Sequence, residues 1–166
     1  MARLTGPVDK LLRLRPLCYE SPQCSDGEWD WLMVEIAVDD GQRRWTAVEP
    51  AFTTRHLRDL VDWFRQLADM DHDARDTFEA IEPNLKFEAE RWNGVTCVRA
   101  LFSHEYHPDE CHPDWKASPT YEFSVFSVEF EPGPTALRQF ADELERDLIP
   151  FPRRFPTDAE SPQGGG

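Results

Sequence analysis

The chain has 166 residues, of which 40% are hydrophobic and 12% aromatic. This length and apolar content suit one globular domain of ordinary size and exclude a chain that stays disordered. Lys and Arg number 18 against 32 Asp and Glu, so the formal net charge is −14. That charge repels nucleic acid and anionic membranes at long range and attracts basic proteins, so we expect no nucleic-acid or membrane partner.

The lack of a targeting signal and the pattern of the cysteines predict a protein of a reducing compartment. No stretch approaches the roughly 18 consecutive apolar residues of a membrane helix, and the first ten residues lack the apolar core of a secretion signal. We therefore expect a cytoplasmic protein. Its cysteines form no CxxC pair and are expected to be free thiols. They are Cys18, Cys24, Cys97 and Cys111.

The first part of the chain predicts strands. Residues 11–19 alternate apolar and polar side chains around Pro16, which is typical of an edge strand or of two short extended pieces. Residues 31–50 predict a hairpin, because apolar residues share one face of its first strand and Asp40-Gly41 suits a tight turn.

A helix is expected to follow, beginning near Thr53 or Thr54, whose hydroxyl can accept a hydrogen bond from an amide of the first turn. Trp63 falls to the side of the stripe that the helical spacing defines. The buried stripe consists of Leu57, Leu60, Val61, Phe64, Leu67 and Ala68.

The middle of the chain predicts a polar loop and then more strands. Residues 69–76, DMDHDARD, are acidic and aperiodic, which indicates a solvated loop. Asn93-Gly94 is typical of a hairpin turn. Strands are expected over residues 77–82, 85–89 and 95–102.

Residues 121–130 begin with apolar side chains on one face and continue with apolar side chains on the other, which favours a bulge near Val125 and Phe126. Pro132 and Pro134 then introduce a second helix that Pro150 ends. Its buried stripe consists of Leu137, Phe140, Ala141, Leu144 and Leu148.

These elements predict an α+β fold. Successive strands joined by short turns form an antiparallel sheet of about six strands, and two amphipathic helices pack on it. We expect a single domain over residues 1–155. Residues 156–166 lack apolar content and are expected to be a disordered tail.

One stretch, SHEYHPDECHPDW, gathers potential metal ligands. Zinc is bound by such residue types, so a zinc-binding protein or metal-dependent hydrolase is one hypothesis. Structural zinc sites draw their ligands from two clusters, and a second cluster is missing here, so a solvated loop is the better interpretation. The acids around Cys111 also make it a poor nucleophile. The candidate ligands are His104, His107, Cys111 and His112.

The order of several segments resembles the WapI-like immunity protein family. They are WLMVEIAVDDGQRRWTAVEP, FTTRHLRDLVDWFRQLA, IEPNLKFE, ALFSHEYHP, a later Trp115 and a C-terminal helix ending in FPRR, which together span residues 26–154. The resemblance implies a small cytoplasmic protein, not an enzyme and without a cofactor, that binds and neutralises the C-terminal domain of a large polymorphic toxin. The chain departs from the family pattern at YHPDECHPD, which lengthens the link to Trp115.

No binding residues come with the resemblance, so we choose candidate partner contacts by expected exposure and by charge. Acidic residues complement a basic toxin domain, and an exposed Trp beside acids can anchor a protein interface. The candidates are Asp69, Asp71, Asp73, Asp76, Glu105, Asp109, Glu110, Asp114 and Trp115.

Overall fold

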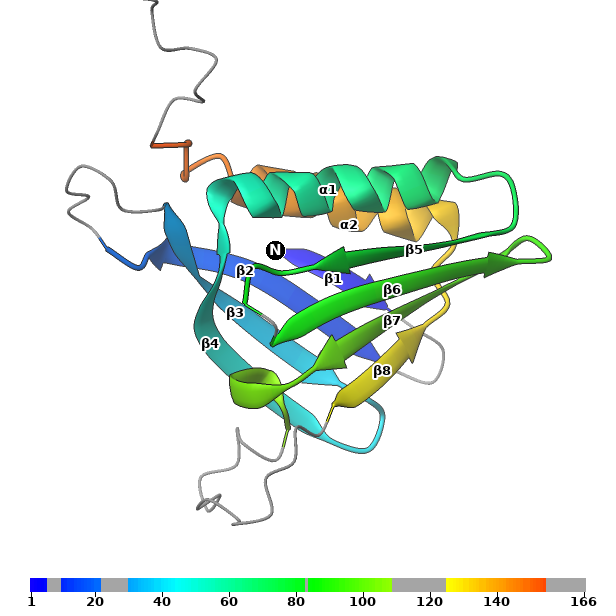
Figure 1. Ribbon diagram of the computed structural model, residues 1–166, viewed down its shortest axis with the longest axis horizontal. Coiled ribbons are helices and arrows are strands. Elements are labelled where there is room, and N and C mark those ends of the chain that lie inside the picture. Colours follow the sequence, from blue (N-terminus) through cyan, green and yellow to red (C-terminus); the bar gives the residue numbers. More distant parts are fainter. Residues whose placement is uncertain (6–9, 22–29, 83, 109–124, 155–166) are drawn as a thin grey trace, which may run out of the picture.

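The computed structural model describes residues 1–5, 10–21, 30–82, 84–108 and 125–154. It confirms the α+β class: two helices accompany strands that pair in antiparallel fashion throughout these residues (Figure 1). The strands form two sheets of four instead of one sheet of about six.

In chain order the elements are β1 (Ala2–Thr5), β2 (Leu11–Tyr19), β3 (Trp31–Asp39), β4 (Arg44–Thr53), α1 (Thr54–Asp69), β5 (Ala74–Glu79), β6 (Leu85–Trp92), β7 (Val95–Phe102), the 3-10 turn η1 (His104–Tyr106), β8 (Phe126–Phe130) and α2 (Pro134–Asp147).

The first sheet has the order β1-β2-β3-β4. Its β1 strand was not predicted, and because it pairs with residues 11–14, β2 is not an edge strand over that half. Beyond Leu14, β2 pairs with β3 alone among the described strands, and Pro16 lies in this half, next to a register shift. A proline without an amide hydrogen is tolerated there because the ladder has no second neighbour.

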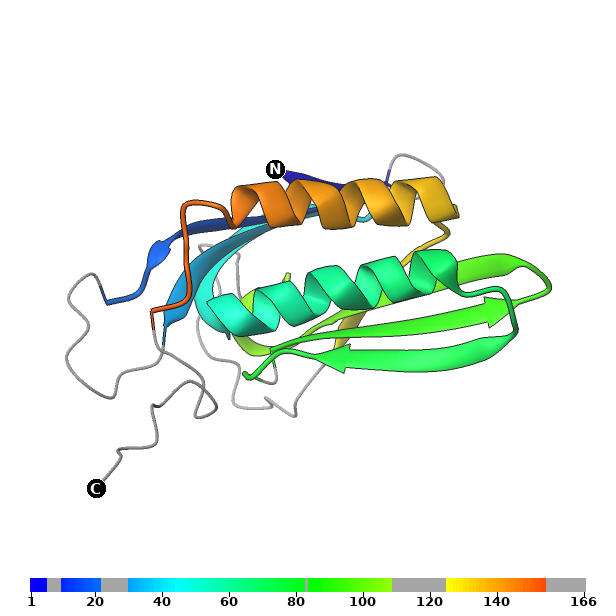
Figure 2. The ribbon, with the colours of Figure 1, turned by 90° about the horizontal axis from the view of Figure 1, so that it is seen from above.

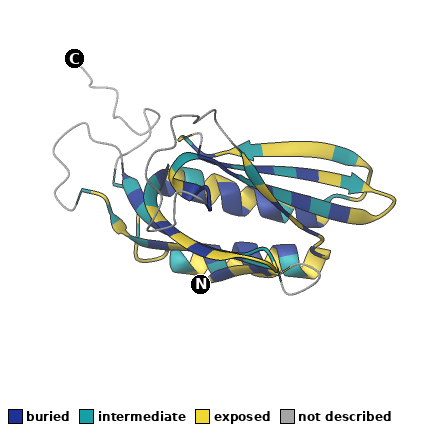
Figure 3. Cartoon of the chain, turned by 90° about the horizontal axis from the view of Figure 1, so that it is seen from below, coloured by how far each residue is buried: buried dark blue, intermediate teal, exposed yellow. Residues whose placement is uncertain are grey.

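The second sheet has the order β5-β6-β7-β8. Strand β5 begins at Ala74, so the expected loop over residues 69–76 is shorter than predicted and the expected strand over 77–82 starts earlier. Its charged sequence ARDTFE hides the alternation, because the strand lies at an edge and is mostly exposed (Figure 3). The bulge predicted near Val125 and Phe126 is not tested: residues 126–130 pair regularly with β7, and residues 121–124 lie outside the described residues.

Both helices cover the inner side of the sheets, with α1 over the second sheet and α2 over the first, as the view from above shows (Figure 2). Phe64 of α1 joins the two helices and the second sheet, because its ring centroid lies 4.5 Å from that of Phe140 and 5.7 Å from that of Phe87. The apolar stripes predicted for both helices are buried.

Turn and cap residues behave as their chemistry predicts. Thr53 caps α1, its hydroxyl accepting a hydrogen bond from the His56 amide. Gly41 has a φ angle of 89°, while Asn93 and Gly94 have φ angles of 50° and 81°, the left-handed values that tight hairpin turns demand. The hairpin predictions are confirmed.

Aromatic side chains join the two sheets. Trp45 of β4 is buried, and its ring centroid lies 5.5 Å from those of Phe102 and Phe126, in edge-to-face contact. The Trp45 indole also donates a hydrogen bond to the carbonyl oxygen of Tyr106, over 3.1 Å. The seam between the sheets therefore fixes the position of η1.

Candidate functional site

Acidic side chains lie at one end of the molecule, where α1 leads into β5 beside the turn between β6 and β7 (Figure 1). Asp73 ties the two segments together, since its Oδ1 accepts a hydrogen bond from the Asn93 amide. Asp69 forms an ion pair of 2.6 Å with Arg138 of α2. Asp71 is exposed, and a hydrogen bond with His72 lowers the pKa of its carboxyl group. Asp69 and Asp73 are thus held by contacts with neighbouring elements.

Asp76, another predicted contact, has a structural partner. Its Oδ2 accepts a hydrogen bond of 3.0 Å from the indole of Trp63. Trp63 was placed beside the buried stripe, but it is buried as well, because the rings of Phe64, Phe78 and Phe87 surround it. Asp76 therefore satisfies a donor that would otherwise lose its hydrogen bond with water.

Two apolar side chains are exposed at the same end. Trp92 is 63% exposed and Val95 is 55% exposed, and the register places them opposite each other on the outer face of the hairpin. The left-handed Asn93-Gly94 turn and the Asp73 hydrogen bond fix the position of this pair. An exposed tryptophan on a rigid hairpin with acids nearby has the composition of a protein-binding anchor. We call Asp69, Asp71, Asp73, Trp92 and Val95 the acidic end.

Sequence reasoning did not find this pair. Trp92 was not assigned to any element, and Val95 was predicted only as the first residue of the strand over 95–102. The signal lies in the turn: residues that flank a two-residue hairpin turn pair with each other, so Trp92 and Val95 must share a face. Among the other five tryptophans, Trp45 and Trp63 are buried and Trp31 is partly buried. Trp29 and Trp115 lie outside the described residues.

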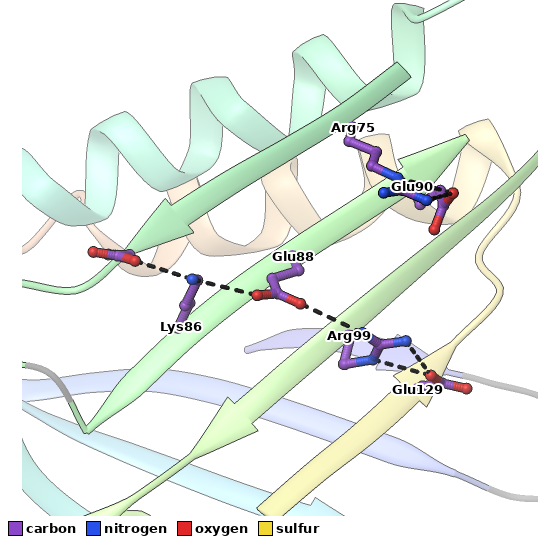
Figure 4. A network of polar contacts seen from close by, with 7 residues as sticks. Arg75, Lys86, Glu88, Glu90, Arg99 and Glu129 are labelled. Atoms are coloured by element: carbon purple, nitrogen blue, oxygen red, sulfur yellow. Dashed lines mark hydrogen bonds and ion pairs between the residues drawn. The ribbon is translucent and has the colours of Figure 1, made fainter. Parts of the chain in front are cut away.

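The outer face of the second sheet is covered by paired charges (Figure 4). Arg99 contacts Glu129 at 2.7 Å and Glu88 at 3.4 Å. Arg75 contacts Glu90 at 2.8 Å, and the other pairs join Lys86 to Glu79 and to Glu88. Cys97 lies on this face, where burial raises the pKa of its thiol. Among the described residues of this face, each basic side chain is paired with a carboxylate, and the raised pKa of Cys97 disfavours its thiolate.

The other predicted group lies at the far end of the second sheet. Glu105 belongs to η1, which follows β7, and β7 begins at the acidic end. Its eight residues span about 26 Å at 3.3 Å per residue. The two sets of candidate contacts are thus separate surfaces. The remaining candidates, Asp109, Glu110, Asp114 and Trp115, lie outside the described residues.

Of the four potential zinc ligands, two belong to the described residues and two do not. His104 has a φ angle of 49°, and His107 is buried with its ring centroid 6.1 Å from that of Phe126. Cys111 and His112 lie outside the described residues. Within the described part of the chain, no three His, Cys, Asp or Glu residues gather as a metal site would require.

A carboxylate pair lies beside η1. Burial raises the pKa of Glu49, and the negative charge of Glu105 raises it further. The Tyr106 hydroxyl donates a hydrogen bond to the backbone carbonyl of Glu49 over 3.2 Å, so β4 and η1 are held together. Neither contact supplies a base or nucleophile facing a cavity.

The comparison with protein families decides the identity. The model of the immunity protein WapI-like family matches residues 3–152, nearly the whole described domain. The chain belongs to the WapI-like immunity protein family. Searches of curated proteins and of solved structures gave no significant match. Family membership supports an immunity role and gives no support to the zinc hypothesis.

The matched range includes the elements that build the acidic end of this WapI-like protein, from α1 through the hairpin of β6 and β7. It also includes both halves of the seam at Trp45. Among the described residues, no helix is long and apolar enough to cross a membrane.

Proposed function

We propose that this protein binds the C-terminal domain of a polymorphic toxin made by the same cell and neutralises it in the cytoplasm. It acts by binding, without catalysing a reaction and without a cofactor. The match of the immunity protein WapI-like family over residues 3–152 carries this proposal. The net charge of −14 supports a basic toxin domain as the partner, because opposite charges accelerate encounter.

We expect a toxin gene directly beside the gene for this protein, and the decisive experiment uses it. Its C-terminal domain is expressed from an inducible promoter, with and without this protein, and growth is followed. We expect growth arrest without the protein and rescue with it, together with a stable complex in a pull-down. An unrelated toxin domain is the control. Failure to rescue, or rescue without a complex, contradicts neutralisation by binding.

The proposed docking surface is the acidic end. Trp92 and Val95 enter an apolar recess of the toxin, and Asp69, Asp71 and Asp73 face basic residues around it. An anchor works best when it is already held in its bound conformation, and the Asp73–Asn93 hydrogen bond supports such a state here. Occlusion of the toxin's active or substrate site follows if that recess lies beside it.

The Trp92→Ala variant tests the anchor. Because a hot-spot side chain contributes roughly 2 kcal/mol or more, the dissociation constant is expected to rise more than about tenfold. Calorimetry with the purified toxin domain measures it. The control is Ile149→Ala, since Ile149 is 73% exposed and follows α2 at the opposite end. Equal affinities for the Trp92→Ala variant and the wild type would remove the acidic end as the docking surface.

A further inference from the structure

The outer face of the first sheet gathers positive charge in this acidic protein. Arg3 extends from β1 and Arg13 and Arg15 from β2, all at positions that alternate with the buried residues of their strands. Among the described strand residues of this sheet, the acids on the same face are Glu35 and Asp39. The carboxylate of Asp39 forms an ion pair of 2.5 Å with Arg44. The local charge is therefore opposite to that of the whole chain.

Two arginines of this face, Arg3 and Arg13, lack internal compensation, whereas Arg15 lies opposite Glu35 in the register of β2 and β3. Arg3 and Arg13 are directly opposite each other in the register of β1 and β2, an arrangement in which like charges repel. Among the hydrogen bonds and ion pairs of the described residues, none involves the guanidinium of Arg3, Arg13 or Arg15. The Arg13 Nε atom is buried without an acceptor.

In the second sheet, the positive charges of the outer face are paired with carboxylates of the same sheet. There each basic residue of the outer face has a carboxylate within 3.4 Å, as the chain of contacts in Figure 4 shows. The chain has 32 acidic residues to draw on. Two arginines, Arg3 and Arg13, that face each other without a carboxylate indicate that the missing carboxylates come from outside the protein.

The surface around these arginines is hollowed. A depression of about 820 Å³ is lined by four basic residues, by the small side chains Ala37 and Thr46, and by Asp39, which is paired with Arg44. The basic residues are Arg3, Lys10, Arg13 and Arg44. Small residues beside long basic ones leave room for a ligand to reach the guanidinium groups. Planar guanidinium groups bind carboxylates through paired hydrogen bonds.

We propose that this depression binds a carboxylate-rich segment of a partner protein. Glu or Asp side chains of that segment pair with Arg3 and Arg13, relieve their mutual repulsion and satisfy the buried Arg13 Nε. A nucleic acid fits the observations less well, because its dense phosphates are repelled by the remaining −14 charge of the protein. This site lies on the outer face of the first sheet, apart from the acidic end, and does not depend on the proposed immunity function.

The test titrates the full chain with a fluorescein-labelled oligoglutamate peptide and follows fluorescence anisotropy at low ionic strength. We expect saturable binding that salt weakens, and about tenfold weaker binding by the Arg3→Gln, Arg13→Gln double variant. The matched control is Arg58→Gln, Arg153→Gln, which removes two exposed arginines outside the first sheet. Circular dichroism and thermal melting confirm that both variants fold.

Three outcomes overturn the proposal. The first is no binding of oligoglutamate by the wild type. The second is an equal loss of affinity in both double variants, which indicates a general charge effect. The third is tighter binding of an RNA oligonucleotide of similar charge, lost in the Arg3→Gln, Arg13→Gln variant, which identifies the face as a nucleic-acid site. None of these outcomes alters the growth test of the immunity function.

Discussion

Acidic residues in and beside the acidic end differ in whether a buried side chain depends on them, although Asp71 and Asp76 are both exposed. Asp76 and Asp71 were predicted together as contacts, yet Asp76 accepts the hydrogen bond of the buried Trp63 indole, while Asp71 is exposed beside His72. Charge and position in the sequence do not separate the two roles. The contact with another element separates them, because only Asp76 lies where it can accept the hydrogen bond of the Trp63 indole.

Substituting the two residues separates these roles. Asp76→Ala leaves the Trp63 indole without its acceptor and is expected to lower the free energy of unfolding by about 1–2 kcal/mol. Asp71→Ala is expected to change it by no more than about 0.5 kcal/mol, as exposed substitutions usually do. Urea denaturation followed by tryptophan fluorescence measures both. Similar values for the two variants would show that the Trp63 contact contributes nothing.

Glu49 links stability to pH. Burial and the charge of Glu105 raise its pKa above the ordinary 4.5, so the folded state holds the proton more tightly than the unfolded state. The stability that this carboxyl group contributes is complete below pH 4.5 and is lost as the pH rises through the folded pKa. At neutral pH its charge is therefore unfavourable.

The Glu49→Gln variant removes that charge. We expect it to be more stable than the wild type at pH 7, by about 0.5 kcal/mol, and to lose this advantage as the pH falls below 4.5. Thermal melts across this pH range measure the difference. The exposed Glu131→Gln serves as a control. A gain that is the same at every pH would mean that the ionisation of Glu49 is not its cause.

At the scale of the elements, the start of α2 is incompletely capped. Gly133 is the N-cap residue and has no side chain to accept a hydrogen bond, although its φ of −71° is accessible to any residue. A Cβ added there meets no atom within 4 Å. Gly133→Ser is therefore expected to stabilise the fold by a few tenths to about 1 kcal/mol.

Gly133→Ala is the matched control for this cap, since it adds the Cβ without the hydroxyl group. It is expected to give no gain, because alanine is a poor N-cap residue. Chemical denaturation of the two variants compares them directly. Equal stabilities would show that backbone restriction, rather than capping, is responsible.

Much of the element structure followed from the sequence, and the exceptions have physical causes. Helix α1, the β3–β4 hairpin and the Asn93-Gly94 turn were predicted because periodicity and turn chemistry agree there. Strand β1 was missed because four residues are too few to show a pattern. The first residues of strand β5 were predicted as a loop because its exposed edge position favours charged residues over alternation.

The division into two sheets could not be read from the sequence. Local patterns predict strands without naming their partners, and the break between β4 and β5 depends on α1 crossing from one sheet to the other. Trp63 was misplaced for the same reason. A helix that packs on a neighbouring helix as well as on a sheet buries a wider arc than a single stripe, and the Phe64–Phe140 contact shows that α1 does both.

At the scale of the whole molecule, charge is arranged by surface rather than spread evenly. The second sheet neutralises its outer face internally, whereas the first sheet presents unpaired arginines and the acidic end presents carboxylates. The net charge of −14 hides this arrangement. The same protein therefore carries two surfaces of opposite sign, which suit two different partner segments.

The seam at Trp45 also brings together His107 and Phe126, two described points that are far apart in the sequence. His107 and Phe126 have ring centroids 6.1 Å apart, and the backbone beside His107 is fastened to Trp45. A connection between points this close closes at a cost that grows slowly with its length. A short Gly-Ser linker in place of residues 109–124 keeps both of these points, so the melting temperature of that variant measures what the replaced residues contribute to stability. Segments from other family members inserted at this position would then show whether partner choice is transferred with them.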